Sequence, residues 1–502
     1  MLEKTQHAPP RVGVSAGGDD DAEASRPLAR ELNLSADELV CALLALDAPR
    51  RLSLLDSCGS RGASARYLVA GFDPEEVITA RGDSLHIVRR GRIDALDEGE
   101  ERVERGDVLD ALDERLKERR AAWPRTQSSP ASEPFSAGAC IATFSYDLAD
   151  RIEQLRTRHA APPGSDAPHA TLAFYDTLAV HDYETGRTKV LSVGGARRLE
   201  EACATLERHD AREHVLPSAV NGAVAHASWT RDEYERAVAH VKDYIFAGDI
   251  YQANLTQQFI CRLPADATPE QIFLRLRREH PASFAAFIRR DEDVVVSASP
   301  ERFLRVEVGE DGRRVESWPT KGTRPRGATA SDDARLREEL LVSEKDRAEN
   351  VMIVDLMRND LGRVCQYGSV EVLELCAIEE HPTLFHLVSK VRGRVRDDAT
   401  AGDLLRATFP CGSVTGAPKI RAMEIIAELE TLPRGLSMGA LGYFAFDGSL
   451  DLSVAIRTMV VRGRTARFNV GGGVVADSCP SLEYEESLVK ARALLRAVGV
   501  EE

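Results

Sequence analysis

The side chain best suited to nucleophilic chemistry is Lys321, in the segment 319–327 with the sequence PTKGTRPRG. Two arginines, Arg324 and Arg326, follow it closely. Neighbouring positive charge disfavours the ammonium form, so we expect these arginines to lower the pKa of the Lys321 amine. Because a neutral amine is a nucleophile, the segment indicates covalent catalysis by Lys321.

Acidic and basic side chains recur at helical spacing in two further segments. Lys345 and Glu349 are four residues apart and share one face of a predicted helix. Glu483, Glu486 and Lys490 recur at i, i+3 and i+7 and share the face of another. Considered alone, such groups most often form solvated salt bridges. The spacing therefore leaves a metal-binding or catalytic role open.

A run of three glycines, Gly471, Gly472 and Gly473, follows a predicted strand at 466–470. Because glycine has no Cβ, it lets backbone N–H groups approach an anion closely. A flexible turn is the simpler interpretation of the same run.

Periodicity and capping signals predict the elements that must hold these residues. Thr230 and Glu233 have the spacing of a capping box, ahead of a helix that ends at Gly248. The pattern then predicts a strand at 250–261, a long helix at 336–361, a helix that begins at 417–418, strands at 453–461 and 466–470, and a final helix at 480–497.

Composition limits the class of protein. The chain has 502 residues and a net charge of −16; because nucleic-acid binding needs a basic surface, we expect no nucleic-acid partner. No apolar run reaches the roughly 18 to 20 residues that span a bilayer, so we expect no membrane partner. The nine cysteines are scattered and form no C-x-x-C pair. This favours reduced thiols and a cytoplasmic location over zinc or disulfide sites.

Ordered sequence blocks from about residue 135 to the C-terminus resemble a family of chorismate-utilising enzymes. The family contains component I of aminodeoxychorismate synthase, component I of anthranilate synthase, and the salicylate and isochorismate synthases. Within it, the chain resembles the aminodeoxychorismate synthases, whereas the first 130 residues match only faintly. The resemblance is carried by YDLADRIEQL, FYDTLAVHDY, GDIYQANLTQQF, SASPERF, PTKGTRPRG, EKDRAENVMIVDLMRNDLGRV, HPTLFHLVSKV, FPCGSVTGAPKIRAMEII, GALGYFAFDG, AIRTMV and GGGVVADSCPSLEYEESLVKA.

The resemblance implies an α+β fold in which two orthogonally packed antiparallel β-sheets are surrounded by helices, with the active site in the cleft between them. We expect three regions: a disordered tail at 1–30, an N-terminal lobe at 31–215 like that of anthranilate synthase component I, and a chorismate-binding catalytic region at 225–502. Periodicity alone indicates only a mixture of helices and strands.

The resemblance also implies a Mg²⁺ site. Glu349 and Glu486 are expected to hold the ion, with Asp346 and Glu483 in its outer shell. Hard oxygen ligands, few in number and supplemented by water and substrate oxygens, are what Mg²⁺ prefers. The ion would bind the ring carboxylate of chorismate, and the charge would be balanced by Lys345 and Lys490.

The same resemblance implies the substrate contacts. The three glycines at 471–473 and Arg457 are expected to hold a substrate carboxylate. Thr415, just before a predicted helix, is expected to meet substrate oxygens, and His386 to lie near the ring. Glu301 is implied to be the general acid that protonates the departing C4 hydroxyl, for which a raised pKa is suited. A salt bridge to Arg302 is the simpler interpretation of Glu301.

Two positions separate the subfamilies. Lys321 matches the P-x-K-G-T pattern of the aminodeoxychorismate synthases, whereas anthranilate and salicylate synthases have P-x-A-G-T. Gln252 stands where the salicylate and isochorismate synthases carry a water-activating lysine. Because glutamine cannot act as a base, ammonia is the better nucleophile for this chain.

The sequence thus predicts a synthase subunit that converts chorismate and ammonia to 4-amino-4-deoxychorismate through a covalent lysine intermediate. The product would serve p-aminobenzoate and folate synthesis or an aminoaryl secondary metabolite. The sequence shows no G-x-C-x-G elbow of a class-I glutamine amidotransferase, so a glutaminase partner subunit is expected to supply ammonia. The alternatives are anthranilate synthase component I and a non-catalytic regulatory paralogue that binds chorismate.

Two positions depart from the family pattern. Ser437 stands where many relatives have a tyrosine that contacts the ring. Asp56 lies in a Leu-Leu-Asp-Ser segment that faintly resembles the Leu-Leu-Glu-Ser segment with which relatives bind tryptophan. Tryptophan binding therefore stays open.

Overall fold

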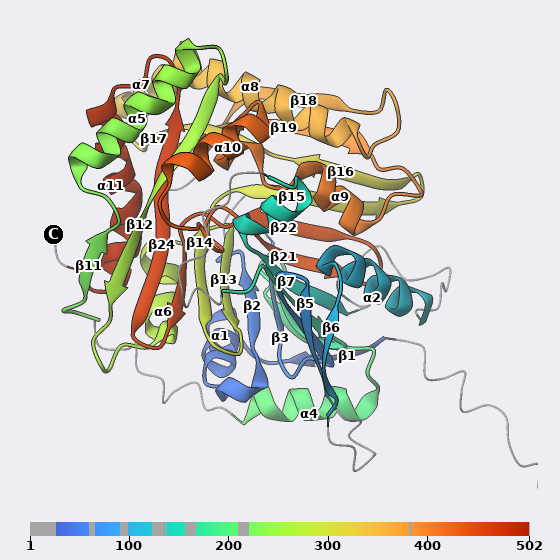
Figure 1. Ribbon diagram of the computed structural model, residues 1–502. Coiled ribbons are helices and arrows are strands. Elements are labelled where there is room, and N and C mark those ends of the chain that lie inside the picture. Colours follow the sequence, from blue (N-terminus) through green and yellow to red (C-terminus); the bar gives the residue numbers. More distant parts are fainter. Residues whose placement is uncertain are drawn as a thin grey trace, which may run out of the picture.

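The computed structural model describes residues 27–59, 66–90, 99–122, 135, 138–155, 167–208, 220–380 and 384–500. Within these ranges the chain forms eleven α-helices and two 12-stranded β-sheets (Figure 1). Every strand pairing within the sheets is antiparallel. The predicted α+β class with two antiparallel sheets is confirmed.

The first sheet has the order β1-β10-β9-β3-β2-β13-β14-β23-β24-β12-β11, and β20 pairs with β12. Its strands are β1 (Leu28–Leu32), β2 (Ser53–Asp56), β3 (Tyr67–Gly71), β9 (Thr177–Asp182), β10 (Arg187–Ser192), β11 (Val224–Ala227), β12 (Gln252–Arg262), β13 (Phe284–Arg289), β14 (Val294–Ser299), β20 (Gly416–Ala417), β23 (Thr458–Arg462) and β24 (Thr465–Val474).

The second sheet has the order β17-β19-β16-β15-β22-β21-β7-β8-β4-β5-β6, and β18 pairs with β19. Its strands are β4 (Glu76–Arg81), β5 (Ser84–Arg89), β6 (Glu101–Arg105), β7 (Ala139–Phe144), β8 (Ala170–Tyr175), β15 (Arg302–Gly309), β16 (Gly312–Ser317), β17 (Thr320–Pro325), β18 (Glu371–Glu380), β19 (Leu384–Arg394), β21 (Ala440–Ala445) and β22 (Leu450–Val454).

Both sheets combine strands from the two ends of the chain. In the first sheet β2 pairs with β13, and in the second β7 pairs with β21. The regions predicted at 31–215 and 225–502 are therefore joined by continuous strand pairing, and the boundary between them stays a prediction. Strand β1 begins inside the predicted tail 1–30, whose residues 1–26 lie outside the described residues.

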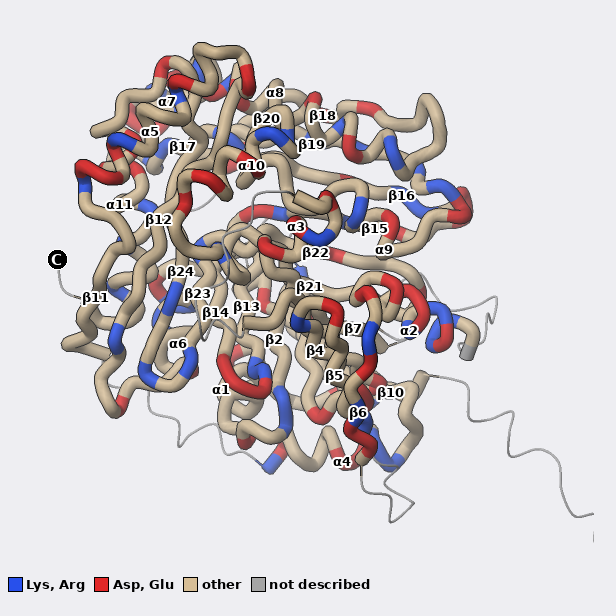
Figure 2. Tube along the Cα trace, in the orientation of Figure 1, with Lys and Arg blue, Asp and Glu red and all other residues tan. Residues whose placement is uncertain are grey.

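Helices cover the sheets on several sides (Figure 1). In that view α5 and α11 stand at the left beside β12 and β24, α8 and α10 lie at the top, and α1 and α4 lie at the bottom. Acidic and basic residues are mixed along α2, α5 and α7 (Figure 2). The helices are α1 (Ala36–Leu44), α2 (Val108–Ala122), α3 (Ala149–Ile152), α4 (Ala196–Glu207), α5 (Arg231–Phe246), α6 (Pro269–Glu279), α7 (Ala330–Val342), α8 (Glu344–Gly362), α9 (Ala401–Thr408), α10 (Lys419–Leu429) and α11 (Pro480–Ala497).

The structure confirms some predicted elements and corrects others. Helix α5 begins with the predicted capping box of Thr230 and Glu233, and the strand at β12 and the final helix α11 are confirmed. The single long helix predicted at 336–361 is wrong. Ser343 has extended backbone and its hydroxyl accepts from the Asp346 N–H, so it ends α7 and caps α8.

Two strand predictions also change. The strand predicted at 453–461 is divided into β22 and β23, because Arg457 between them has a left-handed backbone with φ of 47°. The three glycines lie inside β24 rather than after it, and they pair with β12. They are therefore part of the sheet and do not form a flexible turn.

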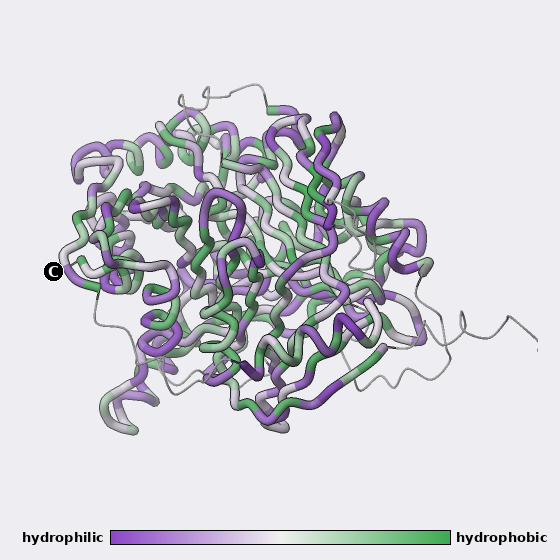
Figure 3. Tube along the Cα trace, turned by 90° about the horizontal axis from the view of Figure 1, so that it is seen from below, coloured by the Kyte–Doolittle hydropathy of each residue, from purple (hydrophilic) through white to green (hydrophobic). Residues whose placement is uncertain are grey.

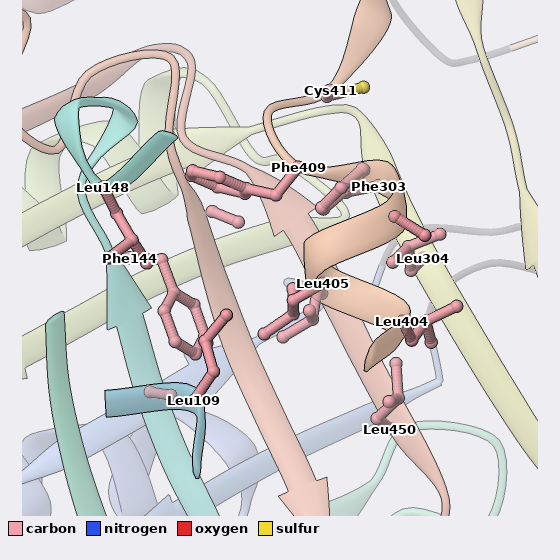
Figure 4. Close-up of a cluster of buried hydrophobic side chains, with 14 of the residues drawn as sticks. Leu109, Phe144, Leu148, Phe303, Leu304, Leu404, Leu405, Phe409, Cys411 and Leu450 are labelled. Carbon is pink, nitrogen blue, oxygen red and sulfur yellow. The ribbon is translucent and has the colours of Figure 1, made fainter. Parts of the chain in front are cut away.

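A large hydrophobic core supports the segment between α9 and α10. Phe303 and Phe409 meet edge to face with ring centroids 6.3 Å apart. Leu404 and Leu405 of α9 and Cys411 lie in the same cluster (Figure 4). Viewed from below, hydrophobic segments alternate with hydrophilic ones along the tube (Figure 3). Among the described residues, no helix is long and apolar enough to cross a membrane.

Candidate active site

Lys321 is held in a largely buried position by an irregular strand. Strand β17 pairs with β19, and its register shifts between Thr320 and Thr323, so Lys321 and Gly322 form a bulge. The Lys321 side chain is 12% exposed, and its Nζ lies 2.9 Å from Glu349 Oε1. Nζ also donates to the backbone carbonyl of Ser413 at 3.0 Å. The amine is therefore fixed from two sides.

The electrostatic environment of Lys321 differs from the sequence prediction. Burial lowers its pKa, but the ion pair and hydrogen bond with Glu349 outweigh burial, so the pKa is raised rather than lowered. Arg324 pairs with Glu339 and Asp346, and Arg326 pairs with Asp333. Because carboxylates neutralise both arginines, they do not depress the Lys321 pKa as predicted.

Glu349 links Lys321 to Gln252. The Gln252 side chain is fully buried, and its Nε2 donates to the same Glu349 Oε1 at 2.9 Å. Gln252 Oε1 has no hydrogen-bond partner within the described part of the chain. Despite burial, the pKa of Glu349 is lowered by the Lys321 ammonium. The lowered pKa favours the charged form of this carboxylate, which can bind a cation or accept a hydrogen bond.

The glycines of β24 make room for these side chains. A Cβ on Gly473 would lie 2.1 Å from Gln252 Nε2 and 2.7 Å from Glu349 Oε1, and one on Gly472 would lie 3.1 Å from Glu483 Oε2. Among the described residues, β23 pairs only with 465–467 of β24, so the glycine stretch has β12 on one edge and no strand partner on the other. Binding of an anion by backbone N–H groups at that edge stays a prediction.

Helix α11 places a second set of charges against the glycines. Lys490 Nζ donates to the Gly471 carbonyl at 2.8 Å and lies 2.8 Å from Glu486 Oε1. Glu483 is buried, and burial and the nearby Glu486 raise its pKa. Lys345 of α8 reaches Glu483 at 3.9 Å. Lys345 and Lys490, the two lysines predicted to balance the charge of the site, thus each lie near one of these glutamates.

Glu301 lies in the turn between β14 and β15 and is 6% exposed. Burial raises its pKa, and Ser413 and Lys321 act in the opposite direction. Its Oε1 has no hydrogen-bond partner among the described residues. Arg302, the simpler partner considered for Glu301, pairs with Asp451 at 2.9 Å. A buried carboxyl whose pKa is raised above its ordinary value is suited to the role of a general acid.

The donor set fits Mg²⁺. Among the described residues, no three or more His, Cys, Asp or Glu side chains are gathered as a ready-made metal cage. Mg²⁺, however, is usually bound by one or two carboxylates together with water and substrate oxygens. Glu349 and Glu486 come from separate helices and face adjacent glycines, with lysines as their present partners. Burial is the main cause of the raised pKa of Glu483, whereas, despite burial, Lys490 lowers the pKa of Glu486.

Four predicted residues are tied less directly to this cluster. His386 Nδ1 lies 2.9 Å from Thr323 Oγ1, two residues beyond Lys321. Thr415 is fully buried, and its hydroxyl donates to the Cys411 carbonyl at 2.9 Å. Asp346 accepts from Arg324 at 3.2 Å. Burial lowers the pKa of Arg457, and no acidic side chain pairs with it within the described ranges.

Ser413 is the functional residue that sequence reasoning missed. It holds Lys321 through its backbone carbonyl, a group that no side-chain pattern reveals. The only available signal was its place in the FPCGSVTGAPK block, two residues before Thr415. Ser437, the departure from the family pattern, accepts a hydrogen bond from the Asn469 N–H at 3.0 Å.

Asp56 is engaged by protein groups in this structure. Its Oδ2 accepts from Arg277 Nε at 2.7 Å, and its Oδ1 accepts from the Tyr183 hydroxyl at 2.7 Å and the Cys58 N–H at 2.8 Å. The carboxylate therefore already has donors on both oxygens. A ligand amine would have to displace one of them.

Gly473→Ala is expected to lower activity on the order of 100-fold, because a displacement of about 1 Å at a catalytic group has that effect. The new Cβ would push Gln252 and Glu349 from their positions. Gly362→Ala is the matched control, since a Cβ there meets nothing within 4 Å. The rate of chorismate consumption measures both, and equal rates would contradict the assigned packing.

Comparisons with known proteins identify the family of the chain. A family model described as chorismate binding enzyme matches residues 55–496. The chain is 41% identical to aminodeoxychorismate synthase component 1 of Klebsiella aerogenes, over 72% of this chain and 77% of that protein. It is 37% identical to anthranilate synthase component 1 of Thermus thermophilus, over 96% of this chain and 99% of that protein.

A solved structure of a related enzyme has a similar fold. Anthranilate synthase component I from Streptococcus pneumoniae aligns with a TM-score of 0.73 and 29% identity, covering 86% of this chain and 93% of that one. The protein therefore belongs to the chorismate-binding enzyme family, in the group that contains component I of aminodeoxychorismate synthase and of anthranilate synthase.

Proposed function

We propose that the protein is the synthase subunit that converts chorismate and ammonia to 4-amino-4-deoxychorismate. The observation that carries this proposal is the buried Lys321 amine, held by Glu349 and Ser413 beside the buried Glu301 carboxyl. An anthranilate synthase needs no nucleophile at this position. The unpartnered acceptor Gln252 Oε1 supports ammonia as the second nucleophile, because ammonia donates hydrogen bonds.

The chemistry divides one displacement into two. Lys321, after giving its extra proton to water, attacks C2 of chorismate as the neutral amine. The two ring double bonds shift, the C4–O bond breaks, and the hydroxyl leaves as water with the proton of Glu301. Ammonia then attacks C4, the double bonds shift back, and the C2–N bond breaks with its electrons returning to Nζ. The Glu301 carboxylate takes the proton that the new ammonium group loses.

The remaining residues bind the substrate. Arg457 and the open edge of the glycine stretch would hold carboxylate oxygens, and Thr415 and His386 would line the ring. Mg²⁺, held by Glu349 and Glu486 with Glu483 and Asp346 nearby, would supply positive charge for the ring carboxylate. Lys345 and Lys490 balance these acidic groups.

The partner and pathway follow from the reaction. The relative from Klebsiella aerogenes is named as a component 1, which supports a second subunit, and a class-I glutamine amidotransferase would supply the ammonia. The product would be used for p-aminobenzoate and folate or for an aminoaryl secondary metabolite.

Product identification tests this proposal. Purified protein is incubated with chorismate, Mg²⁺ and ammonium, and the product is identified by mass and chromatography. We expect chorismate with its C4 hydroxyl replaced by an amine, convertible to p-aminobenzoate by an added lyase. Anthranilate with release of pyruvate would favour the anthranilate synthase alternative, and unchanged chorismate would favour a regulatory paralogue.

Glu301 is expected to titrate above the value of about 4.3 typical of an exposed glutamate, because burial raises its pKa. The carboxyl thus stays protonated over a pH range in which surface carboxyls are ionised. The infrared carbonyl band that is present in the wild type and absent in Glu301→Gln reports this titration. A midpoint at or below that of an exposed glutamate would contradict the general-acid assignment.

A further inference from the structure

Asn350 is the first buried residue along α8, and it directly follows Glu349. Ile353, Val354 and Met357 continue the same buried face at helical spacing, and all three are apolar. Asn350 is fully buried, although the burial of an amide is unfavourable unless hydrogen bonds compensate for the lost water. Packing alone therefore does not explain an asparagine at this position.

The side chain of Asn350 forms two hydrogen bonds with β19. Its Nδ2 donates to the Leu387 carbonyl at 3.1 Å, and its Oδ1 accepts from the Ser389 hydroxyl. The Ser389 hydroxyl oxygen in turn accepts from the Cys376 N–H of β18 at 2.8 Å. Because that N–H can only donate, the hydroxyl proton is left for Asn350. These contacts join α8, β18 and β19, which lie together at the top of the molecule (Figure 1).

Backbone contacts fix the partners of Asn350. The Ser389 N–H donates to the carbonyl of Pro319, two residues before Lys321, at 3.1 Å. Cys376 has a left-handed backbone with φ of 54°, at an irregular point in the pairing of β18 with β19. For a residue other than glycine this conformation is unfavourable, and it persists where the surrounding structure requires it. Ser389 thus connects α8 and β18 to the chain that leads into Lys321.

Hydrogen bonds can fix the rotation of a helix about its axis, whereas apolar contacts do so poorly. Apolar burial has no direction, but a hydrogen bond weakens steeply when the donor turns away from the acceptor. Consecutive residues of an α-helix point about 100° apart, so the contact of Asn350 with β19 determines where Glu349 points. A helix with its side chains has a radius of about 5 to 6 Å, and a rotation of roughly 10° would move the Glu349 carboxylate by about 1 Å.

We propose that Asn350 is a positioning residue that sets the rotation of α8 at which Glu349 meets Lys321. It acts through its hydrogen bonds to Leu387 and Ser389. The inference rests on the proposed function, because it concerns an ion pair within that site. Loss of the network would leave Glu349 and Lys321 in place along the chain but misaligned in space.

Asn350→Leu keeps a side chain of similar size in the core and removes both hydrogen bonds. We expect kcat for chorismate consumption, at saturating chorismate and Mg²⁺, to fall roughly 10- to 100-fold, because a displacement of about 1 Å at a catalytic group has an effect of that order. Ser389→Ala is expected to lower kcat by a smaller factor, since Asn350 Nδ2 keeps its bond to Leu387. In the double variant kcat should stay within about twofold of Asn350→Leu, because both substitutions interrupt one network.

Ile353→Val is the matched control, because Ile353 lies one turn further along the same buried face and has no polar group. Its Tm should fall with the loss of a buried methylene, while its kcat stays within about twofold of the wild type. Crystal structures of the variants supply a readout that does not depend on activity. The distance from Lys321 Nζ to Glu349 Oε1, 2.9 Å in the wild type, should increase by about 1 Å in Asn350→Leu and stay unchanged in Ile353→Val.

An unmoved Glu349 in Asn350→Leu, or a kcat equal to that of Ile353→Val, would overturn the proposal. If Asn350→Leu does not fold, the same two measurements on Ser389→Ala decide. Failure of the proposed function is recognised separately, because chorismate consumption and the distance are measured whatever the product is. Anthranilate as the wild-type product would refute the proposed function, and a displaced Glu349 with a lowered kcat would still support the role of Asn350.

Discussion

Lys321→Ala is expected to lower the formation of aminodeoxychorismate on the order of 1,000-fold or more, because the covalent route is lost with the amine. The side chain is 12% exposed and contacts both Glu349 and Ser413, so the substitution removes an amine that the structure holds in one place. Direct attack of ammonia is the only route that remains. We expect the remaining reaction to form some anthranilate.

Lys390→Ala is the control for the loss of a lysine from the same sheet. Lys390 lies on the neighbouring strand β19, pairs with Glu374 and stands over the Trp318 ring. Steady-state rates with ammonium and product analysis by chromatography compare the two variants. Full aminodeoxychorismate synthesis by Lys321→Ala would refute the nucleophile assignment.

Glu486→Gln is expected to abolish Mg²⁺-dependent turnover. An amide keeps the size of the side chain but removes the charge that a hard cation requires. The loss of Mg²⁺ affinity should be at least the roughly 10- to 100-fold that follows the loss of an outer-shell partner. Glu486 is 51% exposed on its side chain, so solvent Mg²⁺ can reach it.

Glu485→Gln on the same helix is the matched control. Glu485 is 54% exposed and pairs with Arg231, away from the glycines of β24. Mg²⁺ binding by calorimetry and the Mg²⁺-induced rise in Tm are measured for both variants, because a ligand that binds the native state raises Tm. Equal Mg²⁺ affinity in Glu486→Gln and wild type would remove Glu486 from the ligand set.

Local signals predicted the elements around the site where they were strongest. The capping box at Thr230 and the helical spacing from Glu483 to Lys490 are properties of consecutive residues, and α5 and α11 agree with them. The same reasoning failed at Ser343. An apolar periodicity that continues through 336–361 does not reveal a residue whose hydroxyl caps a second helix.

The sequence predicted which residues form the site better than it predicted their electrostatic environment. Lys321 was identified from its segment, but the direction of its pKa depends on Glu349, which is distant in sequence and close in space. The arginines next to it along the chain are neutralised by Asp346 and Asp333. Ser413 was missed because a backbone carbonyl carries its contact. These features depend on contacts between residues that are far apart in the sequence. A single sequence does not show which distant residues come into contact.

The glycines illustrate the same limit. Their run in the sequence indicated an anion-binding loop, whereas the structure places them in β24, where a Cβ on Gly471 would lie 1.9 Å from the Leu255 carbonyl oxygen. Small residues are needed here because a Cβ on Gly471 would clash with the backbone of β12, and a Cβ on Gly473 would clash with Gln252 and Glu349. Among the described residues, the edge of the glycine stretch away from β12 has no strand partner, and anion binding there stays a prediction.

The central claim is the covalent bond between Lys321 and chorismate. Wild-type protein is incubated with chorismate and Mg²⁺ without ammonium, the reaction is stopped, and the digested protein is analysed by mass spectrometry. We predict that the peptide containing Lys321 carries the mass of chorismate minus one water, and that added ammonium removes it. An unmodified Lys321 peptide from protein that still makes aminodeoxychorismate would contradict the account.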